Sequence, residues 1–188
     1  RALLYFWRNG YHASSMSQLV DATGASRHAF YSEFEGKRDL FLACMDHYQP
    51  MVVSPAFAQV EQEGATLEEI CSYFEQQISK AEADALPGPG CLVANVMTEA
   101  APHDTEIADR VELHLDRLEA GFRNAIQNEA DKIDSSIVKI EIANLAELLV
   151  ITTQGTWNQS RLVSSPDSLR RSVSTILDLI KNKLKSQI

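Results

Sequence analysis

The segment between residues 14 and 38, SSMSQLVDATGASRHAFYSEFEGKR, constrains the fold of this chain more than any other part of the sequence. Its first half has the apolar spacing of a short helix, and Gly24 follows where a helix can end in the left-handed conformation. Ser26 then has the position of a capping residue for a second short helix. In that helix Phe30 and Phe34 lie four residues apart and are expected to face the protein. The segment therefore predicts a helix-turn-helix.

The side chains on the outer face of the second short helix are suited to DNA. Arg27, His28 and Tyr31 lie away from the two phenylalanines and are available to a groove or a phosphate. Arg27 is the leading candidate for direct base reading, because a guanidinium can bond the O6 and N7 of guanine together. Ser26 and His28 flank Arg27, and we expect Ala29 to touch a thymine methyl group.

The distribution of charge matters more than its total. The net charge of the 188 residues is −9 at pH 7, whereas residues 1–47 contain five basic and five acidic residues and are neutral. An acidic body with a neutral reading segment predicts that DNA binding depends on a few placed donors. The chain begins at Arg1 within a helical pattern, so we expect a further segment upstream of it in the natural protein.

Composition excludes several classes of protein. The strongest apolar run, near residues 145–151, is too short to span a bilayer, and no signal peptide is visible, so we expect a cytoplasmic protein. Cys44, Cys71 and Cys91 have no metal-ligand spacing, which argues against a zinc site and a disulfide scaffold. We therefore expect no metal and no cofactor.

The whole chain reads as helix and predicts an all-α fold. Pro50 and Pro55 are expected to interrupt or kink the helical pattern after about residue 48. Thr66 and Asp104 are expected to cap the helices that follow them. The expected helices cover about residues 1–10, 15–23, 27–33, 37–48, 66–84, 91–101, a long helix from 104, a helix from 135 or 136 to 162, and 166–185.

Two of the expected helices carry long apolar stripes, which predict buried faces. The segment 137–151 is apolar on more faces than one neighbouring helix can cover, so it is either deeply central or meets another molecule. The two stripes consist of Ile107, Val111, Leu115, Leu118, Phe122 and Ile126, and of Leu169, Val173, Ile176, Leu177, Ile180 and Leu184.

With its flanks, the helix-turn-helix segment YFWRNGYHASSMSQLVDATGASRHAFYSEFEGKRDLF resembles the DNA-binding domain of the TetR family of one-component transcriptional regulators. The resemblance weakens beyond residue 48, although GCLVANVMTEAAPHD, from Gly90 to Asp104, is similar to a segment in many members. The positions that carry the resemblance are Phe6, Gly10, Tyr11, Ser14, Ser15, Gly24, Ser26, Phe30, Tyr31, Phe34 and Lys37.

The resemblance implies an N-terminal three-helix DNA-binding domain at residues 1–47 and a larger helical effector-binding and dimerisation domain at residues 48–188. It further implies a repressor that binds a palindromic double-stranded DNA operator as a homodimer and is released by a small apolar or aromatic ligand. The dimer would form through the two C-terminal helices, about 136–162 and 166–185, and would present two reading helices to successive major grooves roughly 34 Å apart.

The resemblance also assigns roles to side chains. Tyr31 and Lys37 match positions that usually bind phosphate, and Lys37 lies in the first turn of a helix, where free N–H groups also suit an anion. Ser14 and Ser15 are expected to do likewise from the preceding helix. His28 and Glu33 depart from the family, which leaves the operator sequence open.

A small-molecule site is expected among the helices between about residues 48 and 162, although each candidate is also a residue that could serve plain packing. Its expected lining combines aromatic side chains with a few polar ones. The candidates are Phe57, Tyr73, Phe74, Cys91, Asn95, Met97, His114, Gln154 and Trp157.

Cys91 also supports an alternative, in which the protein senses electrophiles or oxidants. It follows a Gly-Pro-Gly turn at an expected helix N-terminus, where backbone N–H groups would lower the pKa of a thiol. A packing role for Cys91 is the other reading of the same residue. A further alternative is a DNA-binding dimer that responds to no ligand.

An enzyme is the competing class of protein. Cys91 with His103 or His114 could form a thiol-nucleophile set, and His114 with Asp116, or Glu99 with Asp104, an acid-base pair. None of these sets has a specific spacing, and the sequence contains no phosphate loop, dinucleotide fingerprint or metal motif. We therefore expect no catalytic activity.

Overall fold

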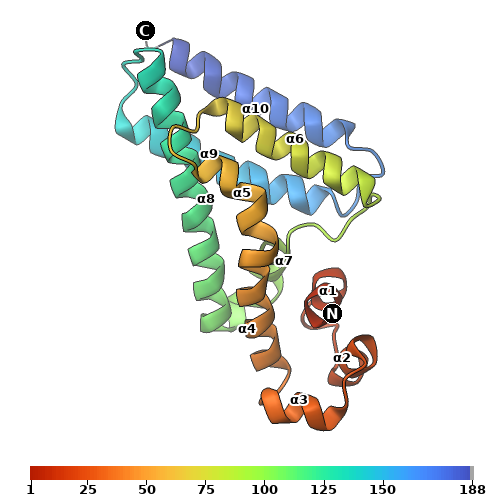
Figure 1. Cartoon of the computed structure of the whole chain (residues 1–188). Helices are drawn as coiled ribbons and strands as arrows, with labels where there is room; N and C mark the ends of the chain where they lie inside the picture. The colour runs from red at the N-terminus through yellow and green to blue at the C-terminus, as the bar shows by residue number, and fades with distance from the viewer. Residues whose placement is uncertain (187–188) are drawn as a thin grey trace. The chain divides into compact units, whose positions relative to one another are not determined.

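The computed structural model describes residues 1–186, and all the regular structure in that range is helical (Figure 1). The all-α fold predicted from the sequence is confirmed. The helices are α1 (Ala2–Asn9), α2 (Met16–Thr23), α3 (Arg27–Glu33), α4 (Lys37–Tyr48), η1 (Gln49–Val53), α5 (Ser54–Glu61), α6 (Leu67–Ala83), α7 (Leu92–Glu99), η2 (Ala101–His103), α8 (Thr105–Lys132), α9 (Lys139–Gln159) and α10 (Asp167–Lys185).

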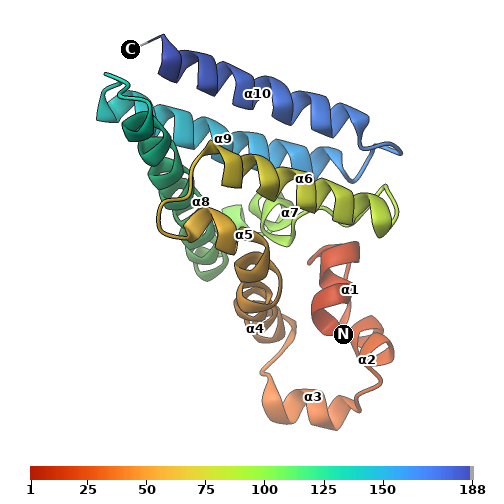
Figure 2. The same cartoon turned by 45° about the horizontal axis from the view of Figure 1, so that its top comes forward.

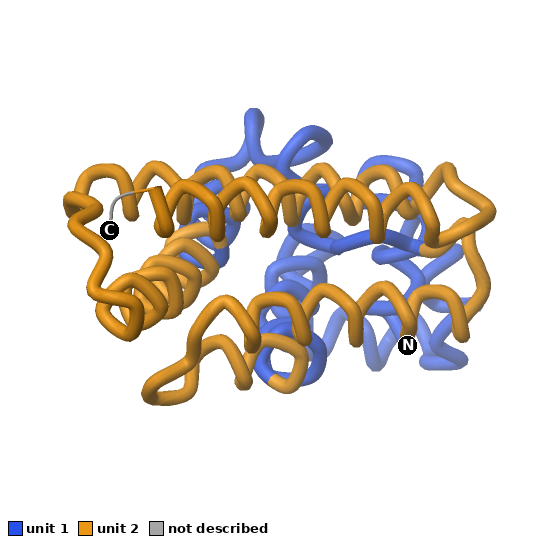
Figure 3. Tube along the Cα trace, turned by 90° about the horizontal axis from the view of Figure 1, so that it is seen from above, with its two compact units in different colours: residues 1–54, 89–114 blue, residues 55–88, 115–188 orange. Residues whose placement is uncertain are grey.

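The chain divides into two compact units (Figure 3). The first unit comprises Arg1–Ser54 and Pro89–His114, and the second comprises Pro55–Gly88 and Leu115–Ile188. In the first unit α1 packs against α2, α4 and α7, and α4 also contacts α7. The helix-turn-helix segment therefore shares its unit with a distant stretch of sequence that contains α7.

Helix starts follow the capping residues that the sequence predicts. Ser15 caps α2 in a capping box, in which the Ser15 N–H donates to Gln18 Oε1 at 2.8 Å. Thr66 does the same for α6, where its N–H donates to Glu69 Oε2 at 2.7 Å. Asp104 Oδ1 accepts two backbone N–H groups of the first turn of α8, at 3.1 and 3.2 Å. These caps satisfy donors that the helix itself leaves unpaired.

The two prolines after α4 do not end the helical path. A π-helical turn, η1, follows Tyr48 with Pro50 near its start, and α5 follows directly with Pro55 in its first turn. A proline lacks the N–H that continues an α-helix, and a π turn is one way of accommodating that loss. The predicted interruption is thus a local change of helix type.

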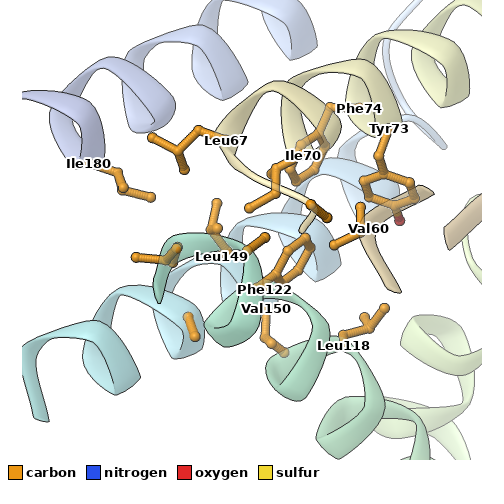
Figure 4. Packing of buried hydrophobic residues seen from close by; sticks show 14 of the residues in the cluster. Val60, Leu67, Ile70, Tyr73, Phe74, Leu118, Phe122, Leu149, Val150 and Ile180 are labelled. Carbon is orange, nitrogen blue, oxygen red and sulfur yellow. The ribbon is translucent and has the colours of Figure 1, made fainter. Parts of the chain in front are cut away.

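The core of the second unit is built around aromatic rings (Figure 4). Phe122 of α8 stands edge-on to Phe57, with ring centroids 5.2 Å apart, and lies nearly parallel to Phe74 at 6.2 Å. Gly121 is required by this packing, because a Cβ at that position would lie 2.6 Å from the ring of Phe57. In Figures 1 and 2, α10 runs alongside α6 and α9, which it contacts.

The two predicted apolar stripes are buried. In α8, all stripe residues have less than a tenth of their surface exposed except Leu115, which is half-buried. In α10 the same holds except for Ile176 and Leu177, which pack partly against the core. Lys183 near the end of α10 donates to Glu141 Oε1 of α9 at 2.6 Å.

The predicted start of α9 is wrong by three or four residues. The helix begins at Lys139 rather than at Ser135 or Ser136, and its cap residue Val138 makes no side-chain hydrogen bond. Ser135 is used elsewhere, because its hydroxyl donates to the carbonyl oxygen of Leu184 at 2.7 Å. A serine that pairs across the fold is not available to cap the next helix.

Candidate nucleic-acid interface

The helix-turn-helix forms as the sequence predicts. Gly24 ends α2 in the left-handed conformation, with φ 74° and ψ 10°, and its N–H donates to the Val20 carbonyl oxygen at 2.9 Å. Leu19 of α2 and Phe30 of α3 are buried. These two side chains anchor the short helices and determine which face of α3 turns outward.

The outer face of α3 presents the predicted DNA-reading side chains together. Arg27, His28 and Ala29 are exposed, and Tyr31 is 59% exposed, whereas Phe30 between them is 6% exposed. The Arg27 guanidinium donates to Ser17 Oγ of α2 over 3.5 Å, which is a long and weak contact. The donors of Arg27 are therefore available to a base edge.

Ser26 acts as the cap of α3. Its Oγ accepts the backbone N–H of Ala29 at 3.1 Å, and its backbone is extended, as at other helix starts. The side chain of Ser26 thus fixes the first turn, on which Arg27 and His28 lie.

Lys37 is held by Tyr11, in the first turn of α4. Its ammonium donates to the Tyr11 carbonyl oxygen at 3.1 Å and lies 4.4 Å above the centroid of the Tyr11 ring. An ammonium has three N–H groups, so this contact leaves donors for a phosphate. Lys37 is half-buried, and both contacts of its ammonium are with Tyr11.

The two predicted serine contacts differ in exposure. Ser14 is buried, and its hydroxyl donates to the Gly10 carbonyl oxygen at 2.5 Å. Ser15 is exposed, although its hydroxyl is already engaged with Gln18 Oε1 at 2.8 Å. Both serines therefore shape the entry to α2, and their contact with DNA stays a prediction.

Glu99, at the end of α7, is a contact that the sequence analysis missed. Its carboxylate accepts the backbone N–H groups of Tyr11 at 2.9 Å and His12 at 2.5 Å. Glu99 lies 88 positions after Tyr11 and 87 after His12, and no local pattern in the sequence marks contacts over such a separation. Gly10, one of the positions that carry the family resemblance, is the signal in the sequence, because a Cβ there would lie 3.0 Å from the Glu99 carboxylate.

A second polar link within the first unit joins α4 to the start of α8. Arg38 donates to both carboxylate oxygens of Asp104, at 2.5 and 2.9 Å, and to Glu106 at 2.9 Å. The adjacent Arg38 guanidinium holds the pKa of Asp104 below its usual range, and the first-turn N–H groups act in the same direction. Arg110 binds Asp46 in a similar two-bond pair, at 2.7 and 2.9 Å.

The predicted ligand-binding residues fall into both compact units. In the second unit, Phe57, Tyr73 and Phe74 belong to the aromatic core, and Trp157 packs against it half-buried. Gln154 of α9 is 6% exposed, and neither its Oε1 nor its Nε2 has a hydrogen-bond partner among the described residues.

The other four candidates lie in the first unit. Asn95 donates from Nδ2 to the Pro89 carbonyl oxygen at 2.9 Å, and its Oδ1 is buried without a partner in the described part of the chain. His114 is buried, with Nδ1 3.4 Å from Gln49 Nε2, and Met97 is half-buried. Cys91 is the fourth.

The alternative in which Cys91 is a reactive thiolate needs a lowered pKa of its thiol, and the structure gives a raised one. Cys91 is 7% exposed, and burial raises the pKa of its thiol, because a thiolate is poorly solvated there. Backbone N–H groups at the start of α7 and the Tyr48 hydroxyl, 3.7 Å from Sγ, act in the opposite direction but are smaller effects. Cys91 is therefore a buried, protonated thiol that packs in the interior of the first unit.

Other classes of site were also sought. Between residues 1 and 186, no group of three or more His, Cys, Asp or Glu side chains could hold a metal ion. Over the same residues, no helix combines the length and the apolar character needed to cross a membrane.

Two segments of the chain match known protein families. Residues 2–44 match the sequence model of bacterial regulatory proteins of the tetR family, and residues 66–176 match that of the tetracyclin repressor-like C-terminal domain. The chain is 28% identical over 162 residues to the uncharacterized HTH-type transcriptional regulator YezE of Bacillus subtilis, covering 86% of this chain and 79% of YezE. It is 26% identical over 179 residues to the HTH-type transcriptional repressor ComR of Escherichia coli, and the alignment covers 95% of this chain and 85% of ComR.

The fold is shared with solved structures. One is a cysteine mutant of the TetR family regulator CifR in complex with 26-bp double-strand operator DNA. The TM-score is 0.81 at 20% identity, and the alignment covers 95% of this chain and 92% of that one.

Proposed function

The chain belongs to the tetR family of bacterial regulatory proteins, and from that premise we propose that it represses transcription by binding a palindromic operator as a homodimer. The family assignment makes it a DNA-binding transcriptional regulator and not an enzyme. We further propose that it acts in the cytoplasm and that a small apolar or aromatic ligand releases it from DNA.

One observation carries the DNA-binding part of the proposal. α3 buries a single side chain, Phe30, and presents Arg27, His28 and Tyr31 on its outer face. A helix held in this way can enter the major groove with its first turn toward the bases. We propose that Arg27 reads a base with Ser26 and His28 beside it, and that Ala29 touches a thymine methyl group. Tyr31 and Lys37 would bind phosphates, as would Ser14 and Ser15 at the start of α2.

The test compares Arg27→Ala with Lys37→Ala on duplexes that the unaltered protein selects from a random library. Arg27→Ala should relax specificity at one base pair by about 1–3 kcal/mol. Lys37→Ala should weaken all sequences alike and lower the slope of log affinity against log salt by about 1. Arg123→Ala, an exposed arginine of the second unit, is the charge-matched control. Equal effects of the first two variants on random DNA would contradict the assignment.

The dimer is proposed from apolar side chains that the single chain leaves uncovered. Leu148 and Ile151 of α9 are exposed, the latter to 61%, and Leu179 of α10 is also exposed. Gly155 continues the same face of α9, and a Cβ there would meet nothing within 4 Å. Exposed apolar side chains grouped in this way favour a self-complementary contact between two copies of the chain.

Sedimentation at micromolar concentration tests the dimer directly. Ile151→Glu should convert it to a monomer and abolish operator binding, because a charge would be buried in the contact. Leu113→Glu, which changes an exposed leucine of α8 in the first unit, should leave the dimer intact. If the unaltered protein is a monomer at this concentration, the proposed mechanism is wrong.

The effector site is proposed from Gln154. A buried amide without partners costs free energy unless something binds it, and a ligand with one donor and one acceptor would satisfy both atoms. The aromatic side chains of Phe57, Tyr73, Phe74 and Trp157 in the same unit suit the apolar body of such a ligand. Asn95, Met97, His114 and Cys91 lie in the first unit, and a ligand contact for each of them stays a separate prediction.

A library of apolar and aromatic compounds tests this part of the proposal. A true effector should raise the melting temperature and weaken operator binding in the same concentration range. If no compound changes either quantity, the ligand-independent dimer is the better description. The alternative sensor role of Cys91 would need Cys91→Ser to abolish release by an electrophile, and the burial of Cys91 argues against that outcome.

A further inference from the structure

We propose that Glu99 is a positioning residue for DNA binding. Its carboxylate holds the backbone at Tyr11 and His12, and Tyr11 in turn holds the ammonium of Lys37. The last step of the proposal rests on the phosphate contact proposed above for Lys37. The DNA contacts of α4 would then depend on a residue of α7 that touches no DNA.

The carboxylate of Glu99 grips the loop between α1 and α2 at two adjacent peptides. Oε2 accepts the Tyr11 N–H at 2.9 Å, and Oε1 accepts the His12 N–H at 2.5 Å. The His12 ring adds a third contact, with Nε2 3.1 Å from the Glu99 carbonyl oxygen. Hydrogen bonds to a charged acceptor are short and strong, so two of them on neighbouring peptides define the course of the loop.

Gly10 shows that the approach of Glu99 to the loop is close. Its φ is +87°, a conformation that side chains rarely adopt, and a Cβ there would lie 3.0 and 3.1 Å from the two carboxylate oxygens. A side chain at Gly10 would therefore be strained by its backbone conformation and would crowd the carboxylate of Glu99. The hydroxyl of Ser14, the residue before the cap of α2, donates to the Gly10 carbonyl oxygen and so ties the start of α2 to the same loop.

Tyr11 connects the hydrogen bonds of Glu99 to α4. Its N–H is bound by Glu99, while its carbonyl oxygen and its ring both hold Lys37. The ring also packs against Phe41, with centroids 4.7 Å apart. A single residue thus lies between the carboxylate of α7 and the ammonium of α4, and each contact is a direct one.

The position of Glu99 on α7 supports a specific role. It is the last residue of a helix whose Leu92, Val93 and Val96 are buried, so the carboxylate is carried by a fixed support. A negative charge at the C-terminal end of a helix is disfavoured by the helix dipole. The two N–H donors of the loop give a physical reason for a carboxylate at this place.

The test uses the full-length protein with Glu99→Ala and Glu99→Gln, and Glu112→Ala as the control. Glu112 is an exposed carboxylate of α8 in the same unit, so its removal matches the change in charge. Hydrogen exchange of the Tyr11 and His12 amides measures whether their hydrogen bonds to Glu99 are present. The salt dependence of binding to the selected duplex measures the phosphate contact of Lys37. Lys37→Ala, alone and with Glu99→Ala, completes a double-mutant cycle.

We expect Glu99→Ala to speed exchange at both amides and to weaken DNA binding by about tenfold, the size expected when bonds to a charged group are lost. Its salt slope should fall by about 1, as for Lys37→Ala, and the double variant should lose no more than the worse single one. Glu99→Gln should be intermediate, because an amide oxygen can replace one acceptor. Glu112→Ala should change none of these quantities.

Three results would overturn the proposal. Unchanged exchange at Tyr11 and His12 would show that Glu99 does not hold the loop. Faster exchange with an unchanged salt slope, or with additive losses, would reduce Glu99 to a merely structural residue. If Lys37→Ala itself leaves the salt slope unchanged, the proposal fails at the phosphate contact of Lys37, while the amide exchange shows separately whether the grip exists.

Discussion

The reading helix α3 and the core of the second unit differ in what their side chains are used for. α3 has seven residues and buries one of them, Phe30. α6, in contrast, buries five side chains, and the rings of Phe74 and Phe122 pack against each other within that core. The second unit is thus held by apolar packing, whereas α3 is held by a cap, one anchor and a turn.

This difference separates the residues that carry stability from those that carry DNA recognition. A packed core tolerates exchange at its surface, and an exposed helix tolerates exchange of any residue that is not its cap or anchor. Substitutions in the two regions should therefore affect different measurements. Substitutions in both regions, taken from the largest expected effect to the smallest, test that separation.

Phe122→Ala should have the largest effect, on the stability of the second unit. Phe122 is fully buried and contacts the rings of Phe57, Tyr73 and Phe74. Its truncation should lower the free energy of unfolding by about 3–5 kcal/mol, which denaturant titration measures. The base preference of the folded fraction should not change. A changed preference at equal folded fraction would break the proposed separation.

Ser26→Ala should destabilise the start of α3 by about 1 kcal/mol, because the Ala29 N–H would lose its acceptor. Hydrogen exchange of the α3 amides without DNA is the measurement. Ser32→Ala is the matched control, since that exposed hydroxyl donates to the Ala29 carbonyl oxygen and caps nothing. Equal effects of both variants would mean that the cap does not position the reading helix.

These examples also show what the sequence could and could not predict. The caps at Ser26, Thr66 and Asp104 and the stripe of α8 were predictable, because each depends on residues within one or two turns. The start of α9 was not, because Ser135 pairs with a carbonyl oxygen of α10, far along the chain.

The candidate site shows the same limit. The outward face of α3 follows from its own spacing, so Arg27 could be named from the sequence. The grip of Glu99 on Tyr11 joins two distant segments and leaves no local pattern. For Cys91 the local argument predicted a lowered pKa, but burial depends on the whole fold and outweighs it.

Gln154→Leu should raise the free energy of unfolding by up to about 1 kcal/mol, because it replaces two buried unpartnered atoms with an apolar side chain of similar size. The same variant should lose its response to an effector. Gln159→Leu, at an exposed position of α9, is the control and should change neither quantity. A destabilised Gln154→Leu would mean that the amide already has a partner, such as a bound water, and would remove its claim to the effector.

Asp104→Asn should have the smallest effect, and its pH dependence identifies the cause. The pKa of Asp104 is lowered in the folded protein, first by the hydrogen bond from Arg38. A lowered pKa stabilises the fold at a pH above the unfolded value of about 4, and this contribution is lost as the pH falls through the folded value. The stability gap between the unaltered protein and Asp104→Asn should therefore be present at neutral pH and close in acid.

The size of that gap should stay under about 1 kcal/mol, because nearly half of the Arg38 side chain is exposed and solvent screens the pair. Denaturant titrations at neutral and acidic pH measure it, and Asp109→Asn, an exposed carboxylate of α8, provides the control. A gap that is constant with pH would mean that Asp104 acts only through neutral hydrogen bonds at the start of α8. The ion pair with Arg38 would then be no part of what holds the first unit, which would rest, like the second, on packing.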